Sequence, residues 1–146
     1  MEILTKILSN KFIWIPFFTW FAIQVFKLVW DLITTKKFNF KRLMGAGGMP
    51  SSHSAIVMAI TVMIGKEYGF DSGVFAMSLA FSSVVMYDAA GVRRAAGKQA
   101  TLLNKIIETP GLTGVEVQER LVEILGHTPM QVFVGAFIGI IVGSIF

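Results

Sequence analysis

Four apolar runs constrain the fold of this chain more than any other feature, and they cover residues 12–34, 51–65, 72–87 and 129–146. A helix needs about 20 apolar residues to cross a bilayer, and the first run meets that length. Only 15% of the residues are charged, whereas soluble domains average roughly 25%. The sequence therefore predicts an all-α integral membrane protein, a bundle of about four transmembrane helices in a single domain over residues 1–146.

Local signals indicate where these helices begin. At ~1.5 Å per residue the second run is shorter than the ~30 Å hydrocarbon core, so we expect its start, at His53, to be recessed inside the protein. Asp71 is the expected N-cap of the third helix. Thr128 followed by Pro129 is typical of a helix start and predicts the beginning of the fourth helix.

The loops after the first and third runs are basic. Their cations are Lys36, Lys37, Lys41 and Arg42 in the first loop, and Arg93, Arg94, Lys98, Lys105 and Arg120 in the third. The positive-inside rule places both loops in the cytoplasm and the two termini outside, in the cell (inner or plasma) membrane. Because the net charge of +4 resides in these membrane-flanking loops, we expect no nucleic-acid partner.

The third loop is long enough to carry structure of its own. Residues 89–107 are rich in alanine and leucine and predict a helix that lies along the membrane interface. Residues 113–116 form a capping-box pattern, and the residues that follow predict a second amphipathic interfacial helix up to residue 125.

The chain has two histidines, His53 and His127, each at the start of an apolar run. An even number of membrane crossings separates them from each other and from Arg93 and Arg94, so all four residues are expected on one face of the membrane. Imidazole and guanidinium groups gathered there favour a phosphoryl group as the ligand. With an ordinary pKa of ~6.5, histidine can deliver a proton near neutral pH.

A stripe of residues on the last helix indicates which way His127 points. The stripe recurs every four residues and consists of His127, Gln131, Gly135, Gly139 and Gly143. Its glycines allow a neighbouring helix to approach closely, either within the chain or in a homo-oligomer. The stripe turns His127 inward, where Gln131 can accept a proton from one ring nitrogen and leave the other free to attack, as expected of a nucleophile.

A second anion-binding candidate precedes the second helix. Gly45, Gly47 and Gly48 come before Pro50-Ser51-Ser52-His53. Glycines ahead of a helix N-terminus let backbone N–H groups converge on an anion. Ser51 and Ser52 either cap the helix or donate to phosphate oxygens. By itself, the segment favours a capped helix with an interfacial histidine.

Together these residues resemble a known superfamily. Pro50-Ser51-Ser52-His53 is similar to the Pro-Ser-Gly-His motif of the type 2 phosphatidic acid phosphatases and vanadium haloperoxidases. His127-Thr128-Pro129-Met130-Gln131 is similar to their His-x-x-x-Asp motif. The stretches 47–55 and 87–100 resemble the divergent branch of that superfamily, and the resemblance covers about residues 30–146.

The resemblance implies a role for each matching residue. His53 would be the general acid that protonates the leaving group, and His127 would attack phosphorus to form a phosphohistidine. Arg93 or Arg94 would hold the phosphate. The other phosphate-binding candidates are Ser51, Ser52, Gly48, Lys98, Lys37 and Arg42.

The chain departs from the superfamily pattern in three places. The first motif, Lys-x6-Arg-Pro, is absent. Ser52 replaces a glycine, and Gln131 replaces the aspartate that orients the nucleophile. Asp88 is expected to compensate, either by facing a histidine or by pairing with an arginine. Lys27 and Asp31, one turn apart in the first apolar run, are interpreted as an intramembrane ion pair in preference to a route to the site.

Two functions follow from these expectations. The first is a metal-independent, cofactor-free hydrolase that acts on a lipid phosphate or a prenyl (pyro)phosphate through a phosphohistidine. The alternative is a non-catalytic protein that binds or carries phospholipid headgroups. In both, the partner is a membrane lipid.

Overall fold

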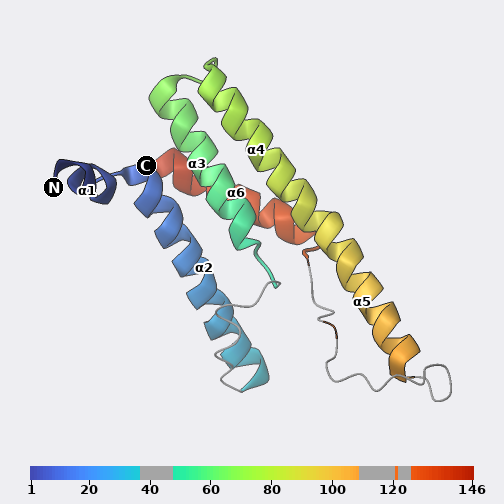
Figure 1. The fold of residues 1–146 in the computed structure, drawn as a ribbon. Helices are drawn as coiled ribbons and strands as arrows, with labels where there is room; N and C mark the ends of the chain where they lie inside the picture. The colour runs from blue at the N-terminus through green and yellow to red at the C-terminus, as the bar shows by residue number, and fades with distance from the viewer. Residues whose placement is uncertain (37–47, 109–120, 122–125) are drawn as a thin grey trace.

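The computed structural model describes residues 1–36, 48–108, 121 and 126–146 (Figure 1). The described residues form helices and connections without any strand, which confirms the all-α prediction. The helices are α1 (Glu2–Leu8), α2 (Lys11–Thr35), α3 (Ser52–Tyr68), α4 (Gly73–Ala90), α5 (Val92–Glu108) and α6 (Pro129–Ile145).

Two helical segments of the described chain are long and apolar enough to cross a membrane. They are Lys11–Thr35, with 25 residues, and Gly73–Glu108, with 36 residues. The 17-residue α6 is also apolar but shorter. The expected runs and the observed helices agree to within a few residues, and the protein is a helical membrane protein. The number of four spans stays a prediction.

Helix α3 is the centre of the bundle and contacts α2, α4 and α6 (Figure 1). A buried hydroxyl cluster joins it to α4: the Thr61 Oγ1 atom lies 2.7 Å from Ser82 Oγ and 2.9 Å from Ser78 Oγ. Ser82 also donates to the Val57 carbonyl oxygen at 3.1 Å. Such hydrogen bonds between helices stabilise membrane bundles, where lipid offers no alternative partner.

The glycine stripe of α6 packs against α3 within the chain. A Cβ atom on Gly135 would overlap the Ser51 carbonyl oxygen, and one on Gly143 would lie 2.6 Å from the Ala59 carbonyl oxygen. The Ser51 backbone N–H donates to the Gln131 carbonyl at 3.0 Å, which fixes the register of the two helices. The predicted close approach is confirmed, and its partner is α3.

Two details of the helix starts and directions differ from expectation. The N-cap of α4 is Ser72, whose Oγ accepts from the Phe75 N–H at 3.2 Å. Asp71 was therefore the wrong choice, by one residue. Helix α5 is present, but it continues the direction of α4 instead of turning across it (Figure 1). The second interfacial helix, expected up to residue 125, lies largely outside the described residues.

Candidate active site

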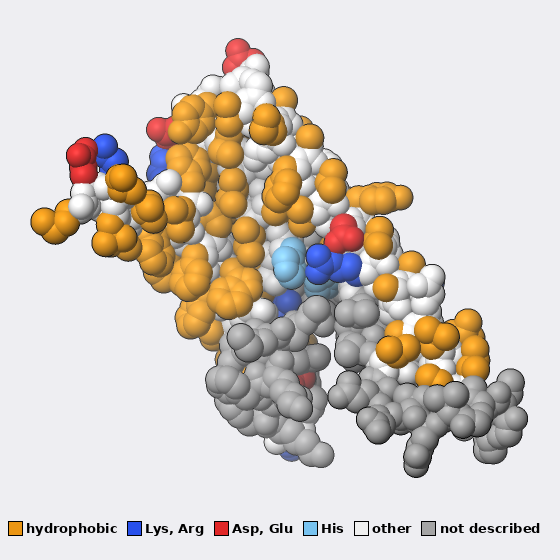
Figure 2. Space-filling view, in the orientation of Figure 1, with side chains coloured by type: hydrophobic (Ala, Val, Ile, Leu, Met, Phe, Trp, Pro, Cys, Tyr) orange, Lys and Arg blue, Asp and Glu red, His pale blue; other side chains and the backbone are white. Residues whose placement is uncertain are grey.

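One small pocket lies where four parts of the chain meet. They are the start of α3, the end of α4, the start of α5 and the residues before α6. The pocket is lined by His53, Val85, Asp88, Ala89, Arg93, Gly126 and His127. In Figure 2 the histidine side chains lie beside basic and acidic side chains, on a face that is otherwise largely hydrophobic. The fold therefore brings together both histidines, one of the two candidate arginines and Asp88.

The backbone at Gly126 and His127 is held against the junction of α4 and α5. The His127 N–H donates to the Ala89 carbonyl oxygen at 2.8 Å. Gly126 has φ of +83°, and a Cβ there would lie 2.8 Å from the Arg93 carbonyl carbon. Both the left-handed backbone and the lack of space require glycine at this position. The sequence analysis missed Gly126, although a glycine directly before a candidate nucleophile was a usable signal.

Gln131 determines which nitrogen of His127 carries the proton. The Thr128 N–H donates to Gln131 Oε1 at 3.0 Å, in a capping box that begins α6. That N–H fixes the amide so that its oxygen faces His127, whose Nδ1 lies 3.3 Å from the same Oε1. An amide oxygen only accepts, so Nδ1 is the protonated nitrogen and Nε2 keeps its lone pair. The expected contact between His127 and Gln131 is present, and the roles of the two residues stay a prediction.

The electrostatic surroundings keep the His127 imidazole neutral. Burial lowers the pKa of His127 below its usual value of 6.5, because only 5% of the residue is exposed and the charged form loses its hydration. The hydrogen bond to Gln131 raises the pKa in opposition, while the positive charges of Lys27 and Arg93 lower it further. A neutral imidazole with a free Nε2 is the form that can act as a nucleophile.

Asp88 pairs with an arginine and not with a histidine. Its Oδ2 atom accepts from Arg93 Nε at 2.6 Å. The aspartate side chain is 36% exposed and the arginine side chain 54% exposed, so the pair stands at the mouth of the pocket. The sequence analysis left two partners open for Asp88, a histidine or an arginine, and the structure shows the arginine.

His53 lies at the rim of the pocket and is exposed, in contrast to the buried His127. The expectation that the start of α3 is recessed inside the protein was wrong for this side chain. Ser52 and Ser54, on either side of His53, are 3% and 0% exposed. Their face of α3 packs into the bundle and therefore turns the histidine outward.

The remaining phosphate-binding candidates lie away from this pocket or outside the described residues. Ser51 is fully buried, caps α3 through the Ser54 N–H at 3.3 Å and accepts from the Ser54 hydroxyl at 2.9 Å. Of the two roles considered for Ser51, capping is the one observed. Ser52, Gly48, Arg94 and Lys98 are not among the residues that line the pocket. Lys37 and Arg42 lie outside the described residues.

Lys27 is a cation for which the sequence analysis preferred an ion pair to a link with the site. Its side chain lies on the buried face of α2, with the residue 8% exposed. Its charge reaches His127 strongly enough to lower the pKa of that imidazole. The usable signal was the cost of a lysine inside a transmembrane helix, which marks a functional position by default. Among the described residues, no group of three His, Asp or Glu side chains is placed to hold a metal ion.

Comparison with known proteins identifies the family of this chain. A family model described as the divergent PAP2 family matches residues 8–142. The chain belongs to the divergent PAP2 family. A relative, the uncharacterized membrane protein YuiD of Bacillus subtilis (strain 168), is 40% identical to this divergent PAP2 protein, and the match covers 81% of the chain and 82% of YuiD. No solved structure matches the chain significantly.

Proposed function

We propose that this protein hydrolyses a lipid phosphate or a prenyl (pyro)phosphate, with the site facing the cytoplasm at the inner membrane. The observation that carries the proposal is the pocket in which His53, His127 and Arg93 meet while the Nε2 atom of His127 keeps its lone pair. Membership of the divergent PAP2 family supports a phosphatase-like relationship. The cations Arg93, Arg94 and Lys98 of α5, a helix that begins at the pocket, support the cytoplasmic orientation.

The first half of the reaction transfers the phosphoryl group to the enzyme. Nε2 of His127 attacks phosphorus, an N–P bond forms, and the bond between phosphorus and the leaving oxygen breaks. His53 gives its proton to that oxygen, so a lipid monophosphate releases an alcohol and a prenyl pyrophosphate releases the prenyl monophosphate. Arg93 balances the charge that develops on the non-bridging oxygens.

The second half returns the enzyme to its starting state. The imidazole of His53, now neutral, takes a proton from water, and the oxygen of that water attacks phosphorus. The N–P bond breaks, inorganic phosphate leaves, and His127 regains its lone pair on Nε2. The same histidine serves as acid and then as base, as microscopic reversibility requires.

The ion pair between Arg93 and Asp88 has a role in admitting substrate. The cavity of about 20 Å³ has room for about one water molecule and not for a phosphoryl group. Both partners of the pair are partly exposed, so the guanidinium is able to exchange the carboxylate for a phosphate at modest cost. The paired state thus holds Arg93 at the pocket mouth until substrate arrives.

The second candidate function is a headgroup binder or carrier without turnover. It is favoured by one observation: Gln131, which is neutral, contacts His127 where the superfamily pattern has a carboxylate. In the serine proteases, the corresponding change from aspartate to asparagine lowers kcat by roughly 10,000-fold. The amide keeps the orientation of the ring but does not stabilise the positive charge that forms on it.

Phosphate release separates the two functions. Purified protein in detergent is incubated with a panel of lipid phosphates and prenyl pyrophosphates, and inorganic phosphate is measured. Release that saturates with substrate supports the hydrolase. Saturable binding of the same lipids with no release, at protein concentrations that allow one turnover to be seen, supports the binder and overturns the hydrolase.

We expect the Lys27→Met variant to retain its fold and to lose affinity for phosphate. Lys27 brings a buried positive charge to the site, so its removal weakens competitive inhibition by inorganic phosphate by about 10-fold, roughly 1.4 kcal/mol. Lys27→Arg keeps the charge and is the matched control. If the methionine and arginine variants are inhibited equally, the charge of Lys27 has no part in phosphate binding.

The pH dependence of hydrolysis follows from the lowered pKa of His127. Because that pKa lies below 6.5, His127 stays neutral as the pH falls from 7, and its protonation reduces kcat/KM only below 6.5. The isosteric Gln131→Glu variant keeps the capping box and adds a negative charge beside Nδ1, which raises the pKa of His127. We therefore expect its acid limb to move to higher pH.

The parent protein and Gln131→Glu are compared on one substrate, so that ionisation of the substrate affects both pH profiles equally. The Gln131→Leu variant, which loses both the cap and the contact to His127, serves as the control for altered structure. An acid limb in Gln131→Glu that coincides with the parent protein would contradict the assignment of this limb to His127.

A further inference from the structure

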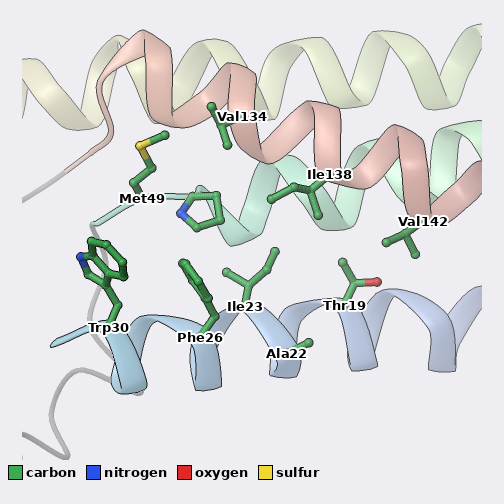
Figure 3. Close-up of a pocket in the computed structure, with 10 residues that line it drawn as sticks. Thr19, Ala22, Ile23, Phe26, Trp30, Met49, Val134, Ile138 and Val142 are labelled. Atoms are coloured by element: carbon green, nitrogen blue, oxygen red, sulfur yellow. The ribbon is translucent and has the colours of Figure 1, made fainter. Parts of the chain in front are cut away.

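A large apolar groove runs between α2 and α6 (Figure 3). Its cavity volume of about 540 Å³ is in the range of ~300–1,000 Å³ typical of ligand sites. Apart from Thr19, its lining side chains are apolar or aromatic. Trp30 and Met49 lie toward one end of the groove, and Thr19 and Val142 lie toward the other. Met49 and Phe26 are about half exposed, at 50% and 53%, so the groove is open to its surroundings.

The first end of the groove lies near the candidate site, although the two cavities share no lining residue. Met49 and Pro50 line it and are followed directly by Ser51, Ser52 and His53. On α6, the groove begins at Val134, one turn after Gln131. On α2, Ile23 lines it, and Lys27 lies one turn further along the same buried face. All three walls of the groove therefore lead toward the residues that hold the phosphate.

We propose that this groove binds one hydrocarbon chain of the lipid whose phosphate is held at His53 and His127. The inference rests on the hydrolase or binder function proposed above. The match is one of polarity: a ligand with an anionic head and an apolar tail places the head among Lys27, Arg93 and the histidines and the tail along the groove. The tail buries apolar surface that otherwise faces lipid or solvent.

The dimensions of the groove agree with this occupant. Along α6 it extends from Val134 to Val142, which corresponds to ~12 Å at 1.5 Å per residue. Half of a ~30 Å hydrocarbon core is ~15 Å. The groove thus spans most of one leaflet, starting from the end of α6 at which His127 lies. A chain that enters it with its phosphate at the headgroup level runs toward the middle of the bilayer.

A substitution within the groove tests the proposal. Ala22 lies on its α2 wall and is exposed, so Ala22→Trp fills the groove without disturbing the packed core. Val25→Trp, on the same helix and 38% exposed but outside the groove, is the matched control. Hexadecyl phosphate and butyl phosphate are the substrates, presented in the same mixed micelles, and the ratio of their kcat/KM values is measured.

We expect Ala22→Trp to lower the ratio of hexadecyl to butyl phosphate hydrolysis by about 10-fold, since losing contact with a few methylene groups is sufficient. Val25→Trp leaves the ratio unchanged. Equal ratios in Ala22→Trp and the parent protein would overturn the proposal. Equal reductions of the ratio in Ala22→Trp and Val25→Trp would also overturn the proposal, because a general effect on α2 would then explain them.

A second measurement does not depend on turnover. A hexadecyl phosphate with a diazirine near the chain end is photocrosslinked to the His127→Ala protein, and the labelled residues are mapped. Labels on the α2 and α6 walls that are lost in Ala22→Trp support the groove proposal. They support it even if no variant hydrolyses any lipid, because absence of hydrolysis refutes only the hydrolase function. Labels elsewhere, or crosslinks at Ala22 to a second copy of the chain, overturn the groove proposal.

Discussion

The His127→Ala variant is expected to lose hydrolysis of every lipid phosphate by about 1,000-fold or more, as nucleophile removal does in other covalent hydrolases. His127 is the buried histidine that lines the pocket and whose Nδ1 contacts Gln131 Oε1. The backbone N–H of residue 127, which donates to the Ala89 carbonyl, is retained in the variant. The loss therefore reports on the imidazole and not on the position of the chain. Phosphate release and thermal unfolding in detergent are measured on the same preparation.

Trapping of the intermediate distinguishes a nucleophile from a base. Rapid quenching of the parent protein with labelled substrate should give an acid-labile, base-stable phosphoenzyme, and His127→Ala should give none. His53→Ala should still form it from an aryl phosphate, because a good leaving group needs no proton from the general acid. A phosphoenzyme of undiminished yield in His127→Ala would remove this residue from the role of nucleophile.

The Gly135→Ala variant is expected to lose stability, although it adds only one methyl group. The added Cβ would overlap the Ser51 carbonyl oxygen, which belongs to the backbone and cannot turn aside. Overpacking of this kind costs about 1–3 kcal/mol, which outweighs the gain of about 1 kcal/mol for replacing glycine by alanine in a helix. Because Ser51 begins α3, activity should fall together with the midpoint of thermal unfolding.

Gly73→Ala is the control for the same chemical change. Gly73 is the first residue of α4, and a Cβ there meets no atom within 4 Å. Its unfolding midpoint should be unchanged or higher. If Gly135→Ala is as stable as Gly73→Ala, α3 and α6 are not packed in the register seen at Ser51.

The helices and their main contact could be predicted from the sequence because both depend on simple periodicity. The four apolar runs correspond to α2, α3, α4 and α6. The four-residue repeat of Gly135, Gly139 and Gly143 predicted a close helix contact, and each of these glycines faces the α3 backbone. The partner helix was not predictable, because a glycine stripe serves a neighbour in the same chain or in another copy equally well.

The sequence predicted which residues gather at the site better than it predicted how these residues are arranged. Counting membrane crossings placed His53, Arg93 and His127 on one face, and they line one pocket. The choice of Asp88 for Arg93 depends on the direction in which α5 leaves α4, which no local pattern encodes. The exposure of His53 depends on which face of α3 the bundle covers.

The effect of Lys27 on His127 was not predicted, for a related reason. In the sequence its nearest opposite charge is Asp31, one turn away, and that proximity favoured a local ion pair. The ammonium influences His127 only because α2 packs beside α3 with this face inward. Long-range proximity of this kind arises from tertiary packing, so spacing along one helix does not predict it.

The capping box at Thr128 and Gln131 determines both where α6 begins and which nitrogen of His127 is protonated. One amide oxygen both begins α6 and holds the proton of His127 on Nδ1. Folding of the first turn of α6 and selection of the His127 tautomer are therefore a single event. Any motion that unwinds this turn lets the proton move to Nε2, while the backbone of His127 stays bonded to Ala89.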